Sequence, residues 1–100
     1  MSKLDELNIQ VTSAIYQAEH LEDGTAESKN AWLEVSRIEE EIAKITTPIE
    51  IEGHIARRGA VSALLEAGET NQARALLTRF ISEGNIDPGS IETLKIRLRE

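Results

Sequence analysis

The sequence has no cysteine, two prolines and three aromatic residues among its 100 positions. Without cysteine, the chain cannot form disulfides, use a thiolate nucleophile or build cysteine-ligated zinc and iron–sulfur sites. The aromatic residues, Tyr16, Trp32 and Phe80, are too few to form a core, so the core must consist of Ile, Leu, Val and Ala. Such residues suit helix-on-helix packing, and no segment alternates in the manner of a half-buried strand. The sequence therefore predicts an all-α protein.

Long apolar runs are also missing. No stretch approaches the roughly 18 apolar residues that cross a bilayer. The N-terminal segment carries Asp5 and Glu6 and has no continuous apolar stretch, so we expect no signal peptide. We expect a cytoplasmic protein with no membrane partner, which the lack of cysteine fits. A length of 100 residues is typical of one domain, so residues 1–100 are interpreted as a single helical domain.

Negative charge predominates and is unevenly distributed. The formal net charge is −7. Residues 1–50 carry four Lys and Arg against eleven Asp and Glu, whereas residues 51–100 carry seven of each kind. An acidic surface repels phosphate groups, which disfavours nucleic acid as a partner. Two interpretations of the acidic half stay open: a solubilising surface and a surface that attracts a basic partner protein.

Two amphipathic helices are predicted in the acidic half, at about 4–22 and 26–45. In each of them, apolar residues recur at steps of three and four, the pattern of one buried helical stripe. Asp23 and Gly24 end the first helix, and Thr25 caps the second. Because the connection is short, the two helices should form an antiparallel hairpin. The two stripes are Leu4, Leu7, Val11, Ala14, Ala18 and Leu21, followed by Ala31, Val35, Ile38, Ile42 and Ile45.

Three further helices are predicted in the second half of the chain. The segment from Thr47 to Glu50 supplies the N-cap, the proline and the glutamate of a capping box. Asp87 and Pro88 give the last helix an N-cap and a proline at its first position. Glycines end the two helices before it. The expected ranges are about 48–67, 71–83 and 88–99.

A stripe of small residues runs along the helix predicted at about 48–67. Its members recur at steps of three and four, so they share one face of the helix. Small side chains let a neighbouring backbone approach closely. Gly53 and Gly59 each weaken a helix by about 1 kcal/mol relative to alanine, a cost that close packing offsets. The stripe consists of Gly53, Ala56, Ala60, Ala63 and Ala67.

These patterns together predict a compact bundle of four to five helices, in which the hairpin packs on the other three helices. The two stripes of the hairpin are long for a domain of this size. Two hairpins paired across a twofold axis would bury the stripes well, so we predict a homodimer.

His54 is the best candidate for chemistry. Arg57 and Arg58 follow at the i+3 and i+4 positions, so an imidazole and two guanidinium groups share one helix face. Those guanidinium groups would stabilise a phosphorylated imidazole through charge-assisted hydrogen bonds. The run from His54 to Gly59 resembles the His-x-x-Lys-Gly of histidine phosphotransfer domains, with Arg57 in place of the lysine and the glycine one residue later. The resemblance implies a helical bundle that carries a phosphoryl group on His54.

Two further resemblances concern helix pairs. Ile55-Ala56 followed by Val61-Ser62 resembles the core of the helix-turn-helix motif of bacterial repressors, which implies DNA binding through the third and fourth helices. A second set of residues resembles the hinge and packing positions of one tetratricopeptide-like pair, which implies a helical hairpin. This second set is Leu64, Leu65, Gly68, Ala73, Leu77 and Phe80.

No catalytic constellation stands out. The serines lack a glycine elbow or a histidine partner, and neither histidine has more than one acid at metal-ligand spacing, where a stable site needs three or four ligands. We therefore interpret the chain as a non-enzymatic protein-interaction module, such as an adaptor, a chaperone or a regulatory subunit, with no cofactor and no metal. Phosphotransfer through His54 is the alternative interpretation, and DNA binding is the second.

The expected contact residues of such a module are the single tryptophan and the acids around it, because tryptophan is a common interface anchor. Three consecutive acids in this set fall away from the apolar stripe of their helix, and we expect them to form a solvated acidic face. The candidate binding residues are Trp32, Glu34, Glu39, Glu40 and Glu41.

Overall fold

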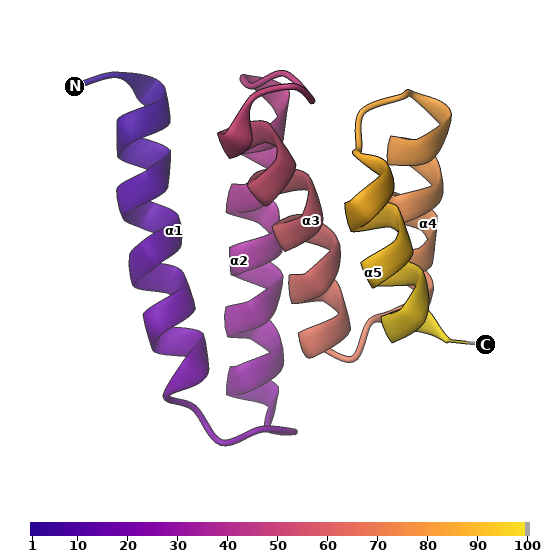
Figure 1. Cartoon of the computed structure of the whole chain (residues 1–100). Helices are drawn as coiled ribbons and strands as arrows, with labels where there is room; N and C mark the ends of the chain where they lie inside the picture. Colours follow the sequence, from indigo (N-terminus) through magenta and orange to yellow (C-terminus); the bar gives the residue numbers. More distant parts are fainter. Residues whose placement is uncertain (100) are drawn as a thin grey trace.

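The computed structural model describes residues 1–99, and over these residues it contains five α-helices and no strand. Successive helices run in alternating directions (Figure 1). None of them, within the described residues, is long and apolar enough to span a bilayer. The predicted all-α bundle is confirmed. The helices are α1 (Lys3–Glu19), α2 (Ala26–Lys44), α3 (Ile51–Glu66), α4 (Thr70–Ser82) and α5 (Pro88–Leu98).

The helices form a flattened row. The α1 helix packs on α2, α2 packs on α3, and α3 packs on both α4 and α5 (Figure 1). The molecule measures 42 × 34 × 16 Å along its principal axes, and its radius of gyration is 13.0 Å. About 13 Å is the radius expected of a compact domain of this length. In this arrangement α2 and α3 each have neighbours on two sides, so each must bury more than one stripe.

Two apolar clusters form the core, and α3 contributes to both. One cluster lies among α1, α2 and α3, and the other lies among α3, α4 and α5. The first cluster buries most of the predicted hairpin stripes. Leu21 and Ile45 are exceptions, at 37% and 49% exposed, because they lie beyond the ends of their helices. The buried members of the two stripes are Leu7, Val11, Ala18, Val35, Ile38 and Ile42.

The small stripe of α3 packs closely on a neighbouring helix, as predicted, and that neighbour is α2. Ala56, Ala60 and Ala63 are each 2% exposed or less, and Gly53 is buried as well. The backbone of α3 comes close enough for Ser36 Oγ of α2 to donate a hydrogen bond to the carbonyl oxygen of Ala60, at 2.8 Å. Small side chains on α3 therefore allow close approach, and a hydroxyl on α2 bonds the buried Ala60 carbonyl.

The helix starts follow the predicted caps in two cases. Thr25 Oγ1 accepts a hydrogen bond from the Ser28 N–H at 3.1 Å. Asp87 Oδ2 accepts one from the Ser90 N–H at 2.9 Å, and Pro88 is the first residue of α5. A side-chain acceptor at the N-cap satisfies one of the free N–H groups of the first turn. These contacts fix where α2 and α5 begin.

Two predicted helix boundaries are wrong. The α1 helix ends at Glu19 instead of 22, and Gly24, at φ +85°, belongs to the turn that follows. The α3 helix begins at Ile51 instead of 48. The Thr47 N–H donates to Glu50 Oε1 at 2.9 Å, and the Glu50 N–H donates to the Thr47 carbonyl at 3.2 Å. These bonds close a separate turn around Pro48, so the predicted capping box precedes the helix.

The α3 and α4 helices form the hairpin that the tetratricopeptide-like pattern implies. Gly68, at φ +80°, turns the chain, and the Glu69 N–H donates to the Leu64 carbonyl at 2.8 Å. This bond is typical of a helix that ends in a left-handed residue. The helix-turn-helix motif, in contrast, is not formed, because α3 runs without a turn through residues 55–62.

Candidate functional site

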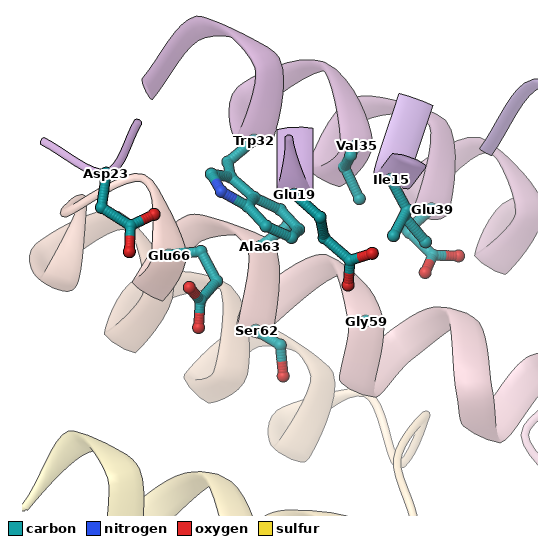
Figure 2. Close-up of a pocket in the computed structure, with 10 residues that line it drawn as sticks. All are labelled: Ile15, Glu19, Asp23, Trp32, Val35, Glu39, Gly59, Ser62, Ala63 and Glu66. Carbon is teal, nitrogen blue, oxygen red and sulfur yellow. The ribbon is translucent and has the colours of Figure 1, made fainter. Parts of the chain in front are cut away.

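A cleft of about 450 Å³ lies between α1 and α3, over the face of α2. The backbones of α1 and α3 do not approach each other, so α2 forms the floor of the cleft. In Figure 2, Trp32 and Glu19 occupy the middle, Asp23 and Glu66 lie toward one end, and Glu39 lies at the other. The lining residues are Ile15, Glu19, Asp23, Trp32, Val35, Glu39, Gly59, Ser62, Ala63 and Glu66.

Glu39 is the most unusual of these residues. Only 6% of its surface is exposed, and no residue in the described part of the chain donates a hydrogen bond to its carboxylate or pairs with it. Burial raises the pKa of Glu39 to about 7, because an ionised carboxylate loses hydration when it is covered. The prediction that Glu39 belongs to a solvated face is therefore wrong.

The burial of Glu39 follows from the central position of α2. The predicted stripe of α2 lies in the cluster shared by α1, α2 and α3, and the packing of α2 on α3 also covers Ser36 and Glu39, which lie against Ala60 and Gly59. Ser36 and Glu39 are three positions apart, so they share a face of the helix.

Gly59 provides the space in which the Glu39 carboxylate lies. A Cβ atom at position 59 would overlap Oε2 and the carboxyl carbon of Glu39. Gly59 lies inside α3, where glycine costs about 1 kcal/mol relative to alanine. The cleft thus costs stability twice, through a glycine inside a helix and through a buried carboxylate without a partner.

Three further carboxylates surround the cleft. Glu19 at the end of α1 and Asp23 in the following turn are exposed, and neither forms an ion pair or hydrogen bond within residues 1–99. Glu66 of α3 accepts a hydrogen bond from Arg97 Nη2 at 2.9 Å, and Arg97 Nη1 donates to Ser62 Oγ at 2.9 Å. One of the four cleft carboxylates is therefore neutralised by α5, and the other three are not.

Trp32 gives the acidic cleft an apolar surface on its floor. Its side chain is partly buried and packs against the cluster among α1, α2 and α3. On α2, Trp32, Val35 and Glu39 follow at positions i, i+3 and i+7, so they form one line along the cleft floor. An aromatic face next to carboxylates suits a cationic ligand.

The structure divides the predicted binding residues into two groups. Trp32 and Glu39 line the cleft, but the other three acids lie elsewhere. Glu34 and Glu41 both pair with Arg37 on the outer face of α2. Glu40 accepts a hydrogen bond from Arg79 of α4 at 2.8 Å. These three carboxylates already have cationic partners within the fold.

No group of three or more His, Asp and Glu residues in the described part of the chain is arranged to hold a metal ion. The cleft carboxylates are spread along the cleft instead of converging on one point (Figure 2). Such spacing suits an extended cation better than a bare ion, which needs several ligands at about 2 Å.

The residues of the phosphotransfer hypothesis are not brought together. His54 is partly exposed, and its Nδ1 lies 3.7 Å from Asp87 Oδ1, so a carboxylate stands beside the imidazole. Arg58 is exposed on α3. Arg57 is buried and turned toward the end of α2. A phosphoryl group on His54 would meet the negative Asp87 and only one of the two guanidinium groups.

Arg57 has a structural role instead. Its Nη2 donates to the carbonyl oxygens of Ala43 and Thr46 at 2.8 and 2.9 Å, and its Nη1 donates to Gly53 at 3.1 Å. The last carbonyls of a helix carry its negative dipole end and lack partners within the helix. Arg57 therefore caps the C-terminus of α2 and ties it to α3.

Sequence reasoning found Trp32 and Glu39 but missed Glu19, Asp23 and Glu66. These acids lie far apart in the sequence, and only the packing of α1 and α3 against α2 assembles them. One signal of the cleft was present in the sequence. Gly59 weakens its helix but lies beside the small stripe, so the packing of that stripe does not explain the glycine.

No family model matches the chain, and neither a curated protein nor a solved structure matches it. The chemistry of the cleft is therefore the basis of the functional argument.

Proposed function

We propose that the protein is a non-catalytic interaction module that binds a basic segment of a partner protein in the cleft between α1 and α3. Such a module acts as an adaptor, a chaperone or a regulatory subunit. The observation that carries the proposal is Glu39, a residue that is 6% exposed and whose carboxylate oxygens open onto the cleft without a partner in the described part of the chain. A cationic side chain in the cleft would supply the missing partner.

The other cleft residues support a basic partner. Glu19 and Asp23 are unpaired in the described part of the chain, so the cleft carries an excess of negative charge that draws a cationic segment toward it. Trp32 supplies the large apolar contact area that interface anchors provide. The acids outside the cleft that pair with Arg37 and Arg79 are less available.

The experiment uses Trp32 as the reporter, because it is the single tryptophan of the sequence. The full chain is titrated with a set of basic peptides, and with acidic peptides of equal length, while tryptophan fluorescence is recorded. We expect saturable binding of basic peptides that weakens as salt is added. An unchanged signal with every basic peptide would refute the proposal.

A matched pair of double variants separates the cleft from general surface charge. Glu19→Gln with Asp23→Asn removes two unpaired charges at the cleft. Glu52→Gln with Glu92→Gln removes two exposed charges that line no part of the cleft. The cleft variant should bind basic peptides several-fold more weakly, and the control variant should bind them almost as wild type does. Equal losses would indicate non-specific attraction.

The predicted homodimer and the cytoplasmic location stay predictions. The hairpin stripes that suggested a dimer are buried among α1, α2 and α3 of one chain, so a dimer would need other surfaces. Light scattering over a dilution series measures the oligomeric state directly.

A further inference from the structure

We infer that the cleft anchors one arginine side chain of the partner, with its methylene stem along Trp32 and Val35 and its guanidinium on the carboxylate of Glu39. This inference rests on the proposed function and names the residue that the cleft recognises. It also assigns to Glu39 a proton that leaves when the arginine enters.

The order of residues on the cleft floor matches the order of groups in an arginine. Trp32 and Val35 are apolar, and Glu39 follows one turn further along α2. Trp32 and Glu39 are seven residues apart, which is about 10 Å along a helix axis. An arginine lying along this line would cover apolar surface with its stem and bring its charge to the buried carboxylate.

The burial of Glu39 favours arginine over lysine. A guanidinium is more weakly hydrated than an ammonium group, so it loses less when it enters a covered site. Its planar fork bonds two carboxylate oxygens at once, and Glu39 lines the cleft with no cationic partner of its own within the described residues. The flat face of the guanidinium also stacks on an indole ring.

Among residues 1–99, no cationic side chain lines the cleft at Glu39. The charged and titratable groups that line the cleft from the packed elements are acids, and Arg97 of α5 bonds to Glu66 and Ser62. On α2 itself, the neighbouring Glu40 pairs with Arg79. His20 follows Glu19 at the end of α1, and its Nδ1 donates to the Tyr16 carbonyl at 2.7 Å. The acids that line the cleft are Glu19, Asp23, Glu39 and Glu66.

Arginine binding should release a proton. In the empty cleft, burial raises the pKa of Glu39 to about 7, so the protonated carboxyl group is populated near neutral pH. A guanidinium favours the ionised carboxylate, and the proton then passes to the solvent. Linkage makes the affinity for arginine rise by about tenfold between pH 6 and pH 8.

The test is calorimetric titration of the full chain with acetylated, amidated hexa-arginine and hexalysine at pH 6, 7 and 8 and constant salt. We expect hexa-arginine to bind at least about threefold more tightly than hexalysine. We also expect its affinity to rise about tenfold with pH, with protons taken up by the buffer. Equal affinities of the two peptides would overturn the choice of arginine.

Two variants identify the group that releases the proton. Glu39→Gln keeps the shape of the side chain and should both weaken hexa-arginine binding at pH 8 and remove its pH dependence. His20→Gln, which replaces the histidine next to Glu19 at the end of α1, should retain the pH dependence. A pH dependence that survives in Glu39→Gln would overturn the inference while the proposed function stands. Failure of wild type to bind either peptide at every pH would overturn both.

Discussion

Arg57 and Glu39, the two buried charged residues among positions 1–99, lie between the same pair of helices but differ in their partners. Arg57 is 5% exposed and donates three hydrogen bonds from its two Nη atoms to carbonyl oxygens of α2, α3 and the turn between them, while its buried Nε has no partner within the described residues. Glu39 is 6% exposed and receives none within the described residues. Both are helix residues at the α2–α3 contact, so burial alone does not separate them. They differ instead in the number of hydrogen bonds that each side chain forms.

This difference separates a structural charge from a binding charge. A buried charge with several hydrogen bonds stabilises the fold, because the bonds replace lost hydration. A buried charge without partners destabilises the fold, and its retention is explained when a ligand supplies the partner. Arg57 belongs to the first class and Glu39 to the second. The spacing of apolar residues does not distinguish these two classes, because Arg57 and Glu39 are both polar residues next to apolar ones.

The largest expected effect is the loss of Arg57. Replacing Arg57 by alanine removes its three hydrogen bonds to the carbonyls of Ala43, Thr46 and Gly53, so the free energy of unfolding should fall by about 4 kcal/mol. Urea unfolding followed by circular dichroism measures the change. Arg57→Lys should lose less stability than the alanine variant, because lysine keeps the positive charge. It should still be less stable than wild type, because it lacks the planar guanidinium that donates to several carbonyls. A loss below about 1 kcal/mol in the alanine variant would show that the cap contributes little.

The next effect is the pH dependence of the unfolding free energy that comes from Glu39. Its sign is opposite to that of an ordinary paired carboxylate. The pKa of Glu39 is raised from 4.5 to about 7, so its contribution to stability is fully present below pH 4.5 and is lost as pH rises through 7. Between pH 5 and pH 8.5, wild type should lose about 2 kcal/mol relative to Glu39→Gln. Denaturant unfolding of both proteins across this range measures the difference.

Glu34→Gln is the matched control for this pH effect, because Glu34 lies on the same helix. A hydrogen bond from Arg37 lowers the pKa of Glu34, so its contribution is present above pH 4.5 and is lost only as pH falls further. The control should therefore follow wild type between pH 5 and pH 8.5. A wild-type profile parallel to that of Glu39→Gln would contradict the assignment of an unpaired buried carboxylate.

The smallest effect tests the fit between Glu39 and Gly59. In a chain with Glu39→Ala, replacing Gly59 by alanine should stabilise α3 by about 1 kcal/mol through helix propensity. In wild type the same replacement should stabilise less or destabilise, because the new Cβ overlaps the Glu39 carboxylate. The four proteins form a double-mutant cycle. Equal effects of Gly59→Ala in both backgrounds would show that the two residues do not share the space.

Much of the fold could be predicted from the sequence, because its signals are local. Apolar spacing gave the five helices, and Thr25 and Asp87 marked two of their starts. The predicted end of the first helix at about 22 and the predicted start of the third at about 48 were wrong, because α1 ends at Glu19 and α3 begins at Ile51. At the start of α3, Glu50 bonds the Thr47 N–H, as the glutamate of a capping box would, but the bond belongs to a separate turn.

The cleft could be predicted only in part, because it depends on which helices are neighbours. The stripe of α2 reveals one buried face, but α2 lies between α1 and α3 and buries two. The sequence pattern therefore predicts a solvated Glu39, whereas the fold covers this residue. The spacing predicts that Arg57 shares a helix face with His54, but its guanidinium instead bonds the C-terminal end of α2. Both errors come from long-range packing that a helical repeat does not contain.

The most direct test of the account is the titration of Glu39 itself. Carbon-13 NMR of its side-chain carboxyl group, assigned with Glu39→Gln, gives the pKa in the free protein and with saturating hexa-arginine. The account predicts a pKa near 7 in the free protein and a fall well below that value when the peptide binds. An ordinary carboxyl pKa of about 4.3 in the free protein would contradict the claim that Glu39 is a covered, unpaired carboxylate.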